Sequence, residues 1–160
     1  MRLLIMRHGQ AESYSNSGYD KDRNLTDAGI DQVTRAAECL SKLNVRVDDL
    51  WVSPYVRAQQ TAEHVNRVLS IETVSTRDFI VPESNPNDFL SSIDIDGDSC
   101  LAIVSHQPYV SSLISLLIQG NLYSGPAMGT ASLCYLESEI NSVGCFSLKW
   151  LRHAPDFNVE

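Results

Sequence analysis

Two histidines and two arginines follow apolar runs of the sequence, in positions suited to holding a phosphoryl group. The first pair belongs to the triplet Arg7, His8 and Gly9, which comes directly after the run Leu3–Met6. Such a run is typical of a buried strand. A histidine can act as a nucleophile, and an arginine can hold phosphate oxygens with two parallel hydrogen bonds. Gly9 lets the backbone turn sharply and approach a ligand closely. The triplet therefore indicates phosphoryl chemistry.

The second arginine and the second histidine follow later apolar runs. Arg57 comes shortly after Leu50–Val52, and His106 comes shortly after Leu101–Val104. If these runs are parallel strands, their carboxyl ends meet at the edge where open α/β sheets bind ligands. Arg57 also falls in the first turn of a predicted helix, where the helix dipole favours an anion. We expect both imidazoles and both guanidiniums to share one pocket.

Strands and helices that alternate along the chain must position these residues. The predicted strands are Arg2–Met6, Leu50–Val52, Phe79–Val81, Leu101–Val104, Ser132–Leu136 and Phe146–Trp150. The first predicted helix runs from the N-cap Thr26 to Leu43, and the second from the N-cap Ser53, with Pro54 as N1 residue, to about Leu69. Two further helices are predicted over Asn87–Ile93 and over Tyr109–Gln119, the last with Gly120 as C-cap. Ser13–Asn24 is a predicted loop and Asp94–Ser99 a predicted turn.

This alternation is typical of the α/β class. We expect a three-layer sandwich, in which a mostly parallel sheet has helices on both faces. The chain shows no repeat and no low-complexity segment, so we expect one domain over residues 1–160.

Composition limits the kinds of binding partner and the cellular compartment that we expect. The net charge of -8 argues against nucleic acid as the main partner, because nucleic-acid binders have basic surfaces. No apolar stretch is long enough for a membrane span, and no signal peptide is recognisable. The four cysteines lack metal-binding spacing. We expect a cytoplasmic, reduced protein that is a monomer.

Together the motifs resemble those of the histidine phosphatase superfamily, which includes the phosphoglycerate mutases. The matching segments are Arg-His-Gly after the first strand, Ser-Pro-x-x-Arg-Ala-x-x-Thr from Ser53, Ser-His-x-Pro from Ser105, and Leu25–Gly29, which is similar to the family's Leu-Thr-x-x-Gly. The resemblance covers Met1 to about Trp150 and implies a phosphoglycerate mutase-like fold. The short interval between Arg57 and His106 is similar to the SixA-like branch, the phosphohistidine phosphatases, because the mutases carry a larger helical insertion there.

The resemblance also implies a role for each residue. His8 is expected to be the nucleophile, which becomes transiently phosphorylated. Arg7, Arg57 and His106 are expected to bind the phosphoryl oxygens and to stabilise the charge of the transition state. No metal or other cofactor is expected, because the guanidiniums take the place of Mg²⁺ as the charge clamp.

Three further residues are weaker candidates. Asn16 resembles a phosphate ligand of the family, and the backbone amide of Gln107 is placed by its position before a helix to contact phosphate. Glu83 is the candidate general acid, although its neighbours differ from the family's pattern. An alkoxide leaving group needs such an acid, whereas imidazole, with a pKa of about 6.5, needs little help. A vacant acid position therefore favours phosphohistidine as substrate.

We expect a phosphatase that hydrolyses phosphohistidine on a protein. The resemblance suggests a component of a phosphorelay or of a phosphotransferase system as that protein. One alternative is a small-molecule phosphomonoesterase of the same fold. Another is a phosphoprotein-binding module with little turnover, although a pure binder has no need of the nucleophile His8.

Overall fold

The computed structural model describes residues 1–93 and 99–157. Its strands form one six-stranded sheet in the order β3-β2-β4-β1-β5-β6. The strands are β1 (Arg2–Arg7), β2 (Asp49–Val52), β3 (Thr73–Thr76), β4 (Cys100–Ser105), β5 (Leu133–Glu137) and β6 (Ser147–Arg152). The helices are α1 (Asp27–Lys42), α2 (Val56–Leu69), α3 (Asn87–Ser91) and α4 (Tyr109–Gln119), with short 3₁₀ helices η1 (Asp20–Asp22) and η2 (Asp78–Ile80).

The sheet is mostly parallel, as predicted. Strands β1 to β4 all run in the same direction, and β5 and β6 add an antiparallel pair beside β1. The central strands β1 and β4 are continuous apolar runs because helices cover both of their faces. The carboxyl ends of β1, β2 and β4 consequently lie at one edge of the sheet.

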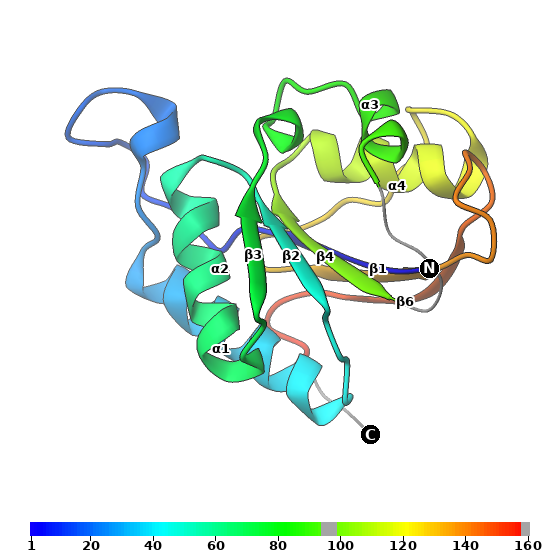
Figure 1. Ribbon diagram of the computed structural model, residues 1–160. Coiled ribbons are helices and arrows are strands. Elements are labelled where there is room, and N and C mark those ends of the chain that lie inside the picture. The colour runs from blue at the N-terminus through cyan, green and yellow to red at the C-terminus, as the bar shows by residue number, and fades with distance from the viewer. Residues whose placement is uncertain (94–98, 158–160) are drawn as a thin grey trace.

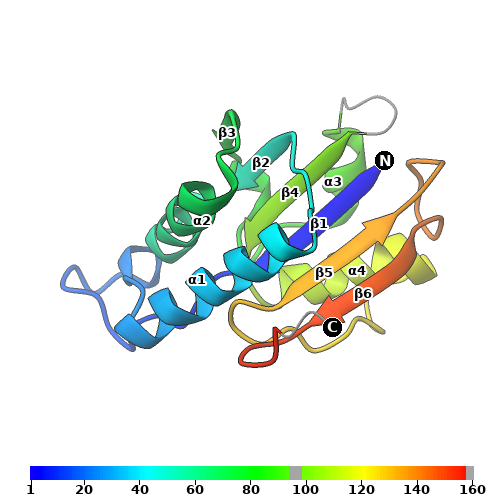
Figure 2. The same ribbon diagram turned by 90° about the horizontal axis from the view of Figure 1, so that it is seen from below.

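Helices α1 and α2 pack on one face of the sheet, and α3 and α4 pack on the other (Figures 1 and 2). Each face has its own apolar core. Val33, Ala37 and Leu40 carry the inner stripe of α1 into the first core. Val110, Leu113 and Leu117 do the same for α4 in the second core. The three-layer α/β architecture is thereby confirmed.

Helix ends agree with the sequence in two places. The Thr26 hydroxyl accepts a hydrogen bond from the Gly29 amide at 3.0 Å and caps α1. Gly120 ends α4 in the left-handed conformation, with φ of 75°. These local signals set where α1 begins and where α4 ends.

Other boundaries differ from the sequence predictions. The N-cap of α2 is Tyr55, so the prediction of Ser53 as N-cap and Pro54 as first helical residue was wrong. Phe79–Val81 is not a strand; Ile80 is fully buried in η2, and Phe79 packs edge-on against Trp51. The strand at this sheet edge is β3, which the sequence did not reveal because its residues are largely polar and exposed. Most of the predicted turn Asp94–Ser99 lies outside the described residues.

Candidate active site

The structure brings Arg7, His8, Arg57 and His106 together at the carboxyl edge of the parallel strands. Arg7 is the last residue of β1, and His8 follows it. His106 follows β4, and its ring centroid lies 4.9 Å from that of His8. Arg57 lies in the first turn of α2, which follows β2. Three strands therefore deliver the four side chains to one cluster, which we call the phosphate cluster.

His8 is held in one tautomer and in its neutral form. Its Nδ1 lies 2.7 Å from the carbonyl oxygen of Gly9, which can only accept, so Nδ1 carries the hydrogen and Nε2 carries the lone pair. Burial, opposed by the Gly9 hydrogen bond and aided by the charges of Arg57 and Arg7, lowers the pKa of His8 to about 4. A neutral imidazole whose Nε2 carries the lone pair is the form that can attack phosphorus.

His106 lies almost fully buried beside His8. Its Nε2 is 2.6 Å from the hydroxyl oxygen of Ser53. Its Nδ1 is buried and has no hydrogen-bond partner among the described residues. Burial and the neighbouring His8 and arginines lower the pKa of His106 to about 2, so this imidazole is neutral too.

Arg7 also has a buried nitrogen without a partner. Its Nη1 donates to the carbonyl oxygen of Met128 at 2.8 Å, while its Nε makes no hydrogen bond within the described structure. Buried polar groups are rarely left in this state, because losing water without gaining a partner is unfavourable. The unpartnered nitrogens of Arg7 and His106 belong to the same cluster, and both suit the oxygens of a bound anion.

Arg57 is only 3% exposed and connects His8 to a carboxylate that the sequence did not point to. Its Nε donates to Nε2 of His8 at 3.2 Å. Its Nη1 donates to the backbone oxygen of Asp20 at 2.7 Å, and its Nη2 lies 3.0 Å from the Asp20 carboxylate. The Nη edge of this guanidinium is therefore already occupied by an acidic side chain.

Asp20 is ionised in this arrangement. Its partial burial favours the neutral acid, but hydrogen bonds and charge from Arg57 and Arg23 outweigh that effect and hold its pKa below the usual value. Asp20 lies in η1, inside the segment predicted as the loop Ser13–Asn24. A loop has no repeating apolar pattern that predicts where its side chains point, so the sequence did not single out Asp20. The one signal for it in the sequence was that acidic residues lie near Arg23.

Glu83 lies at the rim of the cluster rather than in it. Its carboxylate accepts a hydrogen bond from the Tyr55 hydroxyl at 3.2 Å. The Tyr55 ring in turn lies 4.8 Å from the ring of His106 and 4.9 Å from the guanidinium carbon of Arg57. One aromatic side chain thus connects Glu83 to the buried imidazole.

The two weaker phosphate candidates have different surroundings. The Gln107 side chain donates to the Ser111 hydroxyl at 2.6 Å and to the Met128 carbonyl at 3.3 Å, the carbonyl that Arg7 also contacts. Gln107 precedes α4, whose N-cap is Pro108. Asn16 is exposed in a turn, and no hydrogen bond connects it to the phosphate cluster within the part of the chain described.

Backbone contacts hold the loop that carries His8. The Gly9 amide donates to the Thr61 hydroxyl at 3.1 Å, and that hydroxyl donates to the Arg57 carbonyl at 2.7 Å. A Cβ at Gly9 would lie 2.7 Å from both the Gly29 oxygen and a Val33 methyl carbon. The close approach of α1 therefore requires a glycine at position 9, which is a reason that the sequence did not show.

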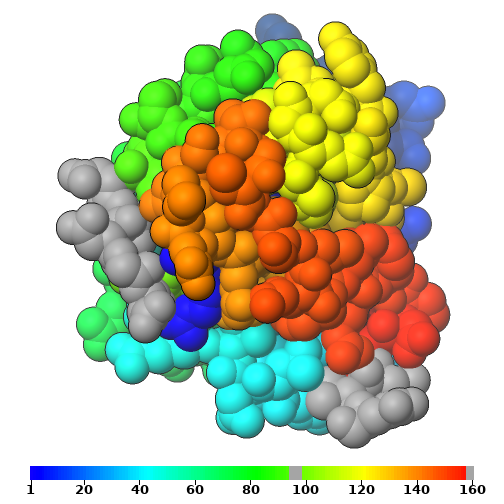
Figure 3. All heavy atoms as spheres, turned by 90° about the vertical axis from the view of Figure 1, so that its right-hand side faces the viewer, coloured from blue at the N-terminus to red at the C-terminus, as the bar shows by residue number. Residues whose placement is uncertain are grey.

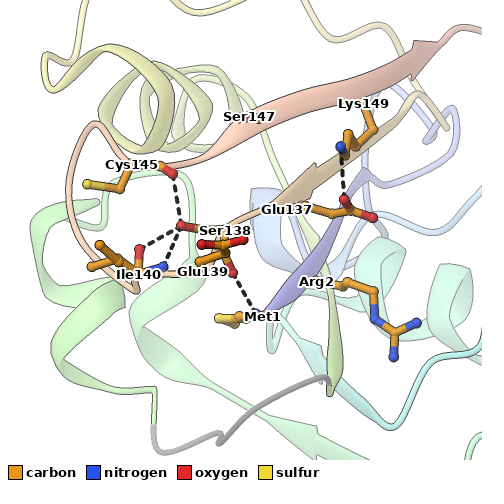
Figure 4. A pocket seen from close by; sticks show the side chains of 9 residues that line it. All are labelled: Met1, Arg2, Glu137, Ser138, Glu139, Ile140, Cys145, Ser147 and Lys149. Carbon is orange, nitrogen blue, oxygen red and sulfur yellow. Dashed lines mark hydrogen bonds and ion pairs between the residues drawn. The ribbon is translucent and has the colours of Figure 1, made fainter.

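A separate pocket of about 640 Å³ lies at the opposite end of β1 (Figures 3 and 4). Arg2 and Glu137 line it, and Lys149 pairs with the Glu137 carboxylate at 3.0 Å. None of the predicted site residues lines this pocket.

Residues 1–93 and 99–157 contain neither a cluster of metal ligands nor a helix suited to spanning a membrane. No group of three or more His, Cys, Asp or Glu side chains in these ranges is placed to hold a metal ion. No helix in the same ranges has the length and apolar character to cross a bilayer.

Comparisons with known proteins agree with this geometry. The sequence profile of the Histidine phosphatase superfamily (branch 1) matches residues 3–80. The chain is 28% identical to the phosphohistidine phosphatase SixA of Escherichia coli K12, over 92% of this chain and 91% of that protein. It is 35% identical to a SixA homolog of Haemophilus influenzae, over 73% of this chain and 77% of that protein.

A solved structure shows the same fold. The structure of the protein histidine phosphatase SixA complexed with tungstate superposes with a TM-score of 0.85 and 25% identity, covering 96% of this chain and 97% of that one. Sequence similarity, fold and the order of the motifs along the chain therefore agree. The chain belongs to the histidine phosphatase superfamily, in its SixA-like branch.

Proposed function

We propose that this phosphatase hydrolyses phosphohistidine carried on another protein, with His8 as the nucleophile. Nε2 of His8 attacks phosphorus and forms a new N–P bond, while the N–P bond of the substrate breaks and its ring, protonated on the other nitrogen, leaves as neutral imidazole. Water then attacks the phosphorylated His8, which releases inorganic phosphate and restores the neutral imidazole. The neutral form of His8 and the lone pair on its Nε2 support this assignment, and the hydrogen bond from Arg57 Nε to that lone pair gives way when the phosphoryl group arrives.

Arg7, Arg57 and His106 are the proposed phosphoryl-binding residues. The unpartnered nitrogens of Arg7 and His106 provide two contacts for phosphoryl oxygens. Nε of Arg57 lies 3.2 Å from Nε2 of His8, so the guanidinium is beside the attacking nitrogen, within reach of the negatively charged oxygens of a phosphoryl group that this nitrogen attacks. Asn16 has less support because it is exposed, and the contact from the Gln107 backbone amide stays a prediction from the position of that residue before α4.

The choice of substrate rests on the position and protonation of the carboxylates near the phosphate cluster. Asp20 contacts the phosphate cluster directly, but its lowered pKa keeps it ionised, so it has no proton to give. Glu83 is exposed and bound to the Tyr55 hydroxyl at the rim. A phosphate ester needs an acid to protonate its alkoxide, whereas imidazole leaves with little assistance. The site therefore suits phosphohistidine better than an ester.

A protein substrate also fits the surroundings of the site. The segment between β1 and α1, blue in Figure 1, projects beyond the sheet beside α2. Tyr14 and Tyr19 on this segment are 86% and 66% exposed, close in sequence to Asp20, which contacts Arg57. Exposed aromatic side chains of this kind are common in protein interfaces. We expect the partner to be a histidine-phosphorylated component of a phosphorelay or of a phosphotransferase system.

The test compares two kinds of substrate with two proteins. Wild type and Glu83→Gln are each given a histidine-phosphorylated protein and, separately, 3-phosphoglycerate and a sugar phosphate. We expect a kcat/KM at least about a hundredfold higher for phosphohistidine, and little change on Glu83→Gln, because a general acid contributes typically about 10² to 10⁴ in rate. Strong ester hydrolysis that falls on Glu83→Gln would instead establish the small-molecule phosphomonoesterase.

A further inference from the structure

We propose that Ser53 is a positioning residue that fixes the tautomer of His106. In this arrangement the Ser53 hydroxyl donates its hydrogen to Nε2 of His106, and Nδ1 of His106 therefore carries the ring hydrogen. The imidazole then presents an N–H donor, and not a lone pair, to a phosphoryl oxygen. The inference deepens the proposed function and rests on it for the identity of the anion.

The surroundings of the hydroxyl decide the direction of the hydrogen bond. Ser53 is fully buried, and its oxygen lies 2.6 Å from Nε2 of His106. The Tyr55 amide donates to the same oxygen at 3.4 Å. No other acceptor for the hydroxyl hydrogen is found among the described residues. If Nε2 donated instead, the buried hydroxyl hydrogen would have no acceptor, which is unfavourable.

The other ring nitrogen supports the same tautomer. Nδ1 of His106 is buried without a partner, in a side chain that is only 1% exposed. A neutral imidazole has one donor and one acceptor nitrogen, so a hydrogen bond accepted at Nε2 makes Nδ1 the donor. A buried donor without a partner, 4.9 Å from the ring of His8 by centroids, is suited to an oxyanion. The other tautomer would present a lone pair to the negative phosphoryl oxygens.

The Ser53 hydroxyl contributes little to the helix that follows. Because α2 begins at Val56 with Tyr55 as its N-cap, the Ser53 hydroxyl makes only one contact with the start of the helix, the long 3.4 Å hydrogen bond from the Tyr55 amide. The backbone at Ser53 is held separately, since its carbonyl accepts a hydrogen bond from the Gln59 side chain at 2.7 Å. Loss of the hydroxyl alone should therefore change His106 more than it changes the fold.

The first measurement reads the tautomer directly. Long-range ¹H–¹⁵N spectra of the ¹⁵N-histidine-labelled protein, assigned with His106→Gln, distinguish a protonated Nδ1 from a protonated Nε2 without any substrate. We expect the wild type to show Nδ1–H and Ser53→Ala to lose that single state. A wild-type spectrum with Nε2–H overturns the proposal, whether or not any variant folds.

The second measurement follows anion binding. Tungstate affinity, measured by calorimetry, should fall about tenfold in Ser53→Ala while the melting temperature stays close to that of a matched control. Ser132→Ala is that control, because it removes a buried hydroxyl 2.8 Å from Nδ1 of His153, outside the phosphate cluster. Unchanged tautomer and affinity in Ser53→Ala overturn the proposal. A protein that shows Nδ1–H and binds tungstate but does not cleave phosphohistidine would sink the proposed function alone.

Discussion

Replacing Asp20 by asparagine should strengthen the binding of phosphate-like anions. The Asp20 carboxylate lies 3.0 Å from Nη2 of Arg57, and the Asp20 carbonyl accepts from Nη1 of the same guanidinium. A phosphoryl group that uses the Nη edge of Arg57 must displace this carboxylate or share the guanidinium with it. Asp20→Asn keeps the shape of the side chain and removes the competing charge.

The expected size of the effect follows from exposure. The Asp20 side chain is 59% exposed, so its ion pair with Arg57 is partly screened by water and contributes at most about 1 kcal/mol. Since about 1.4 kcal/mol corresponds to a factor of ten in an equilibrium constant, the gain in tungstate affinity should be no more than about fivefold. It should shrink at high salt, which screens exposed charges.

Calorimetric titration with tungstate measures this gain, and the chain provides a matched control. Asp22 lies in the same 3₁₀ helix and bonds to the Ser17 hydroxyl at 2.6 Å. Asp22→Asn makes the same change in net charge without touching Arg57, and it should alter affinity less. Weaker binding in Asp20→Asn would refute competition and would show that the carboxylate positions Arg57. An equal gain in both variants would show only a general effect of charge.

Two further predictions concern stability. The free energy of unfolding should fall as the pH drops below about 6.5, because His8 protonates near 6.5 in the unfolded chain but only at about 4 in the folded protein. One unit of pKa difference corresponds to about 1.4 kcal/mol, so His8 alone should lower the free energy of unfolding by roughly 2 kcal/mol between pH 7 and pH 5. Denaturant titration at the two pH values measures this loss. Equal stability at both would contradict the buried neutral form of His8. Gly9→Ala should lower the free energy of unfolding by about 1–3 kcal/mol in thermal unfolding, because its Cβ would press on Gly29 and Val33. Gly129→Ala is the control. It should not lower stability in this way, because its Cβ would come no closer than 3.4 Å to the Ser132 hydroxyl.

The sequence predicted two kinds of feature correctly. These are strands that are buried on both faces and helix ends that depend on residues close together in the chain. Strands β1 and β4 stand out because both of their faces are covered, and Thr26 caps α1 through an amide three residues ahead. The edge strand β3 lacks such a signal, since its polar residues face solvent. The apolar run Phe79–Val81 was assigned to a strand because apolar character alone does not distinguish a strand from a buried 3₁₀ turn.

Contacts between distant segments could not be predicted in the same way. Ser53 has the residue type and position of an N-cap, but its hydroxyl is taken by His106, which follows another strand. Asp20 meets Arg57 only because the polar segment before α1 folds back over α2. The motifs therefore located the phosphate cluster. Ser53, which contacts His106, and Asp20, which pairs with Arg57, reach the cluster only through tertiary packing.

Detection of a phosphorylated His8 tests the central claim most directly. Wild type and His8→Asn are mixed with a histidine-phosphorylated protein, quenched in alkali to preserve N–P bonds, and mapped by mass spectrometry within the first turnover. We predict a transient phosphoryl group on His8 in the wild type, with release of inorganic phosphate, and neither label nor release in His8→Asn. Phosphate release that persists in His8→Asn, or a label on another residue, would contradict the account.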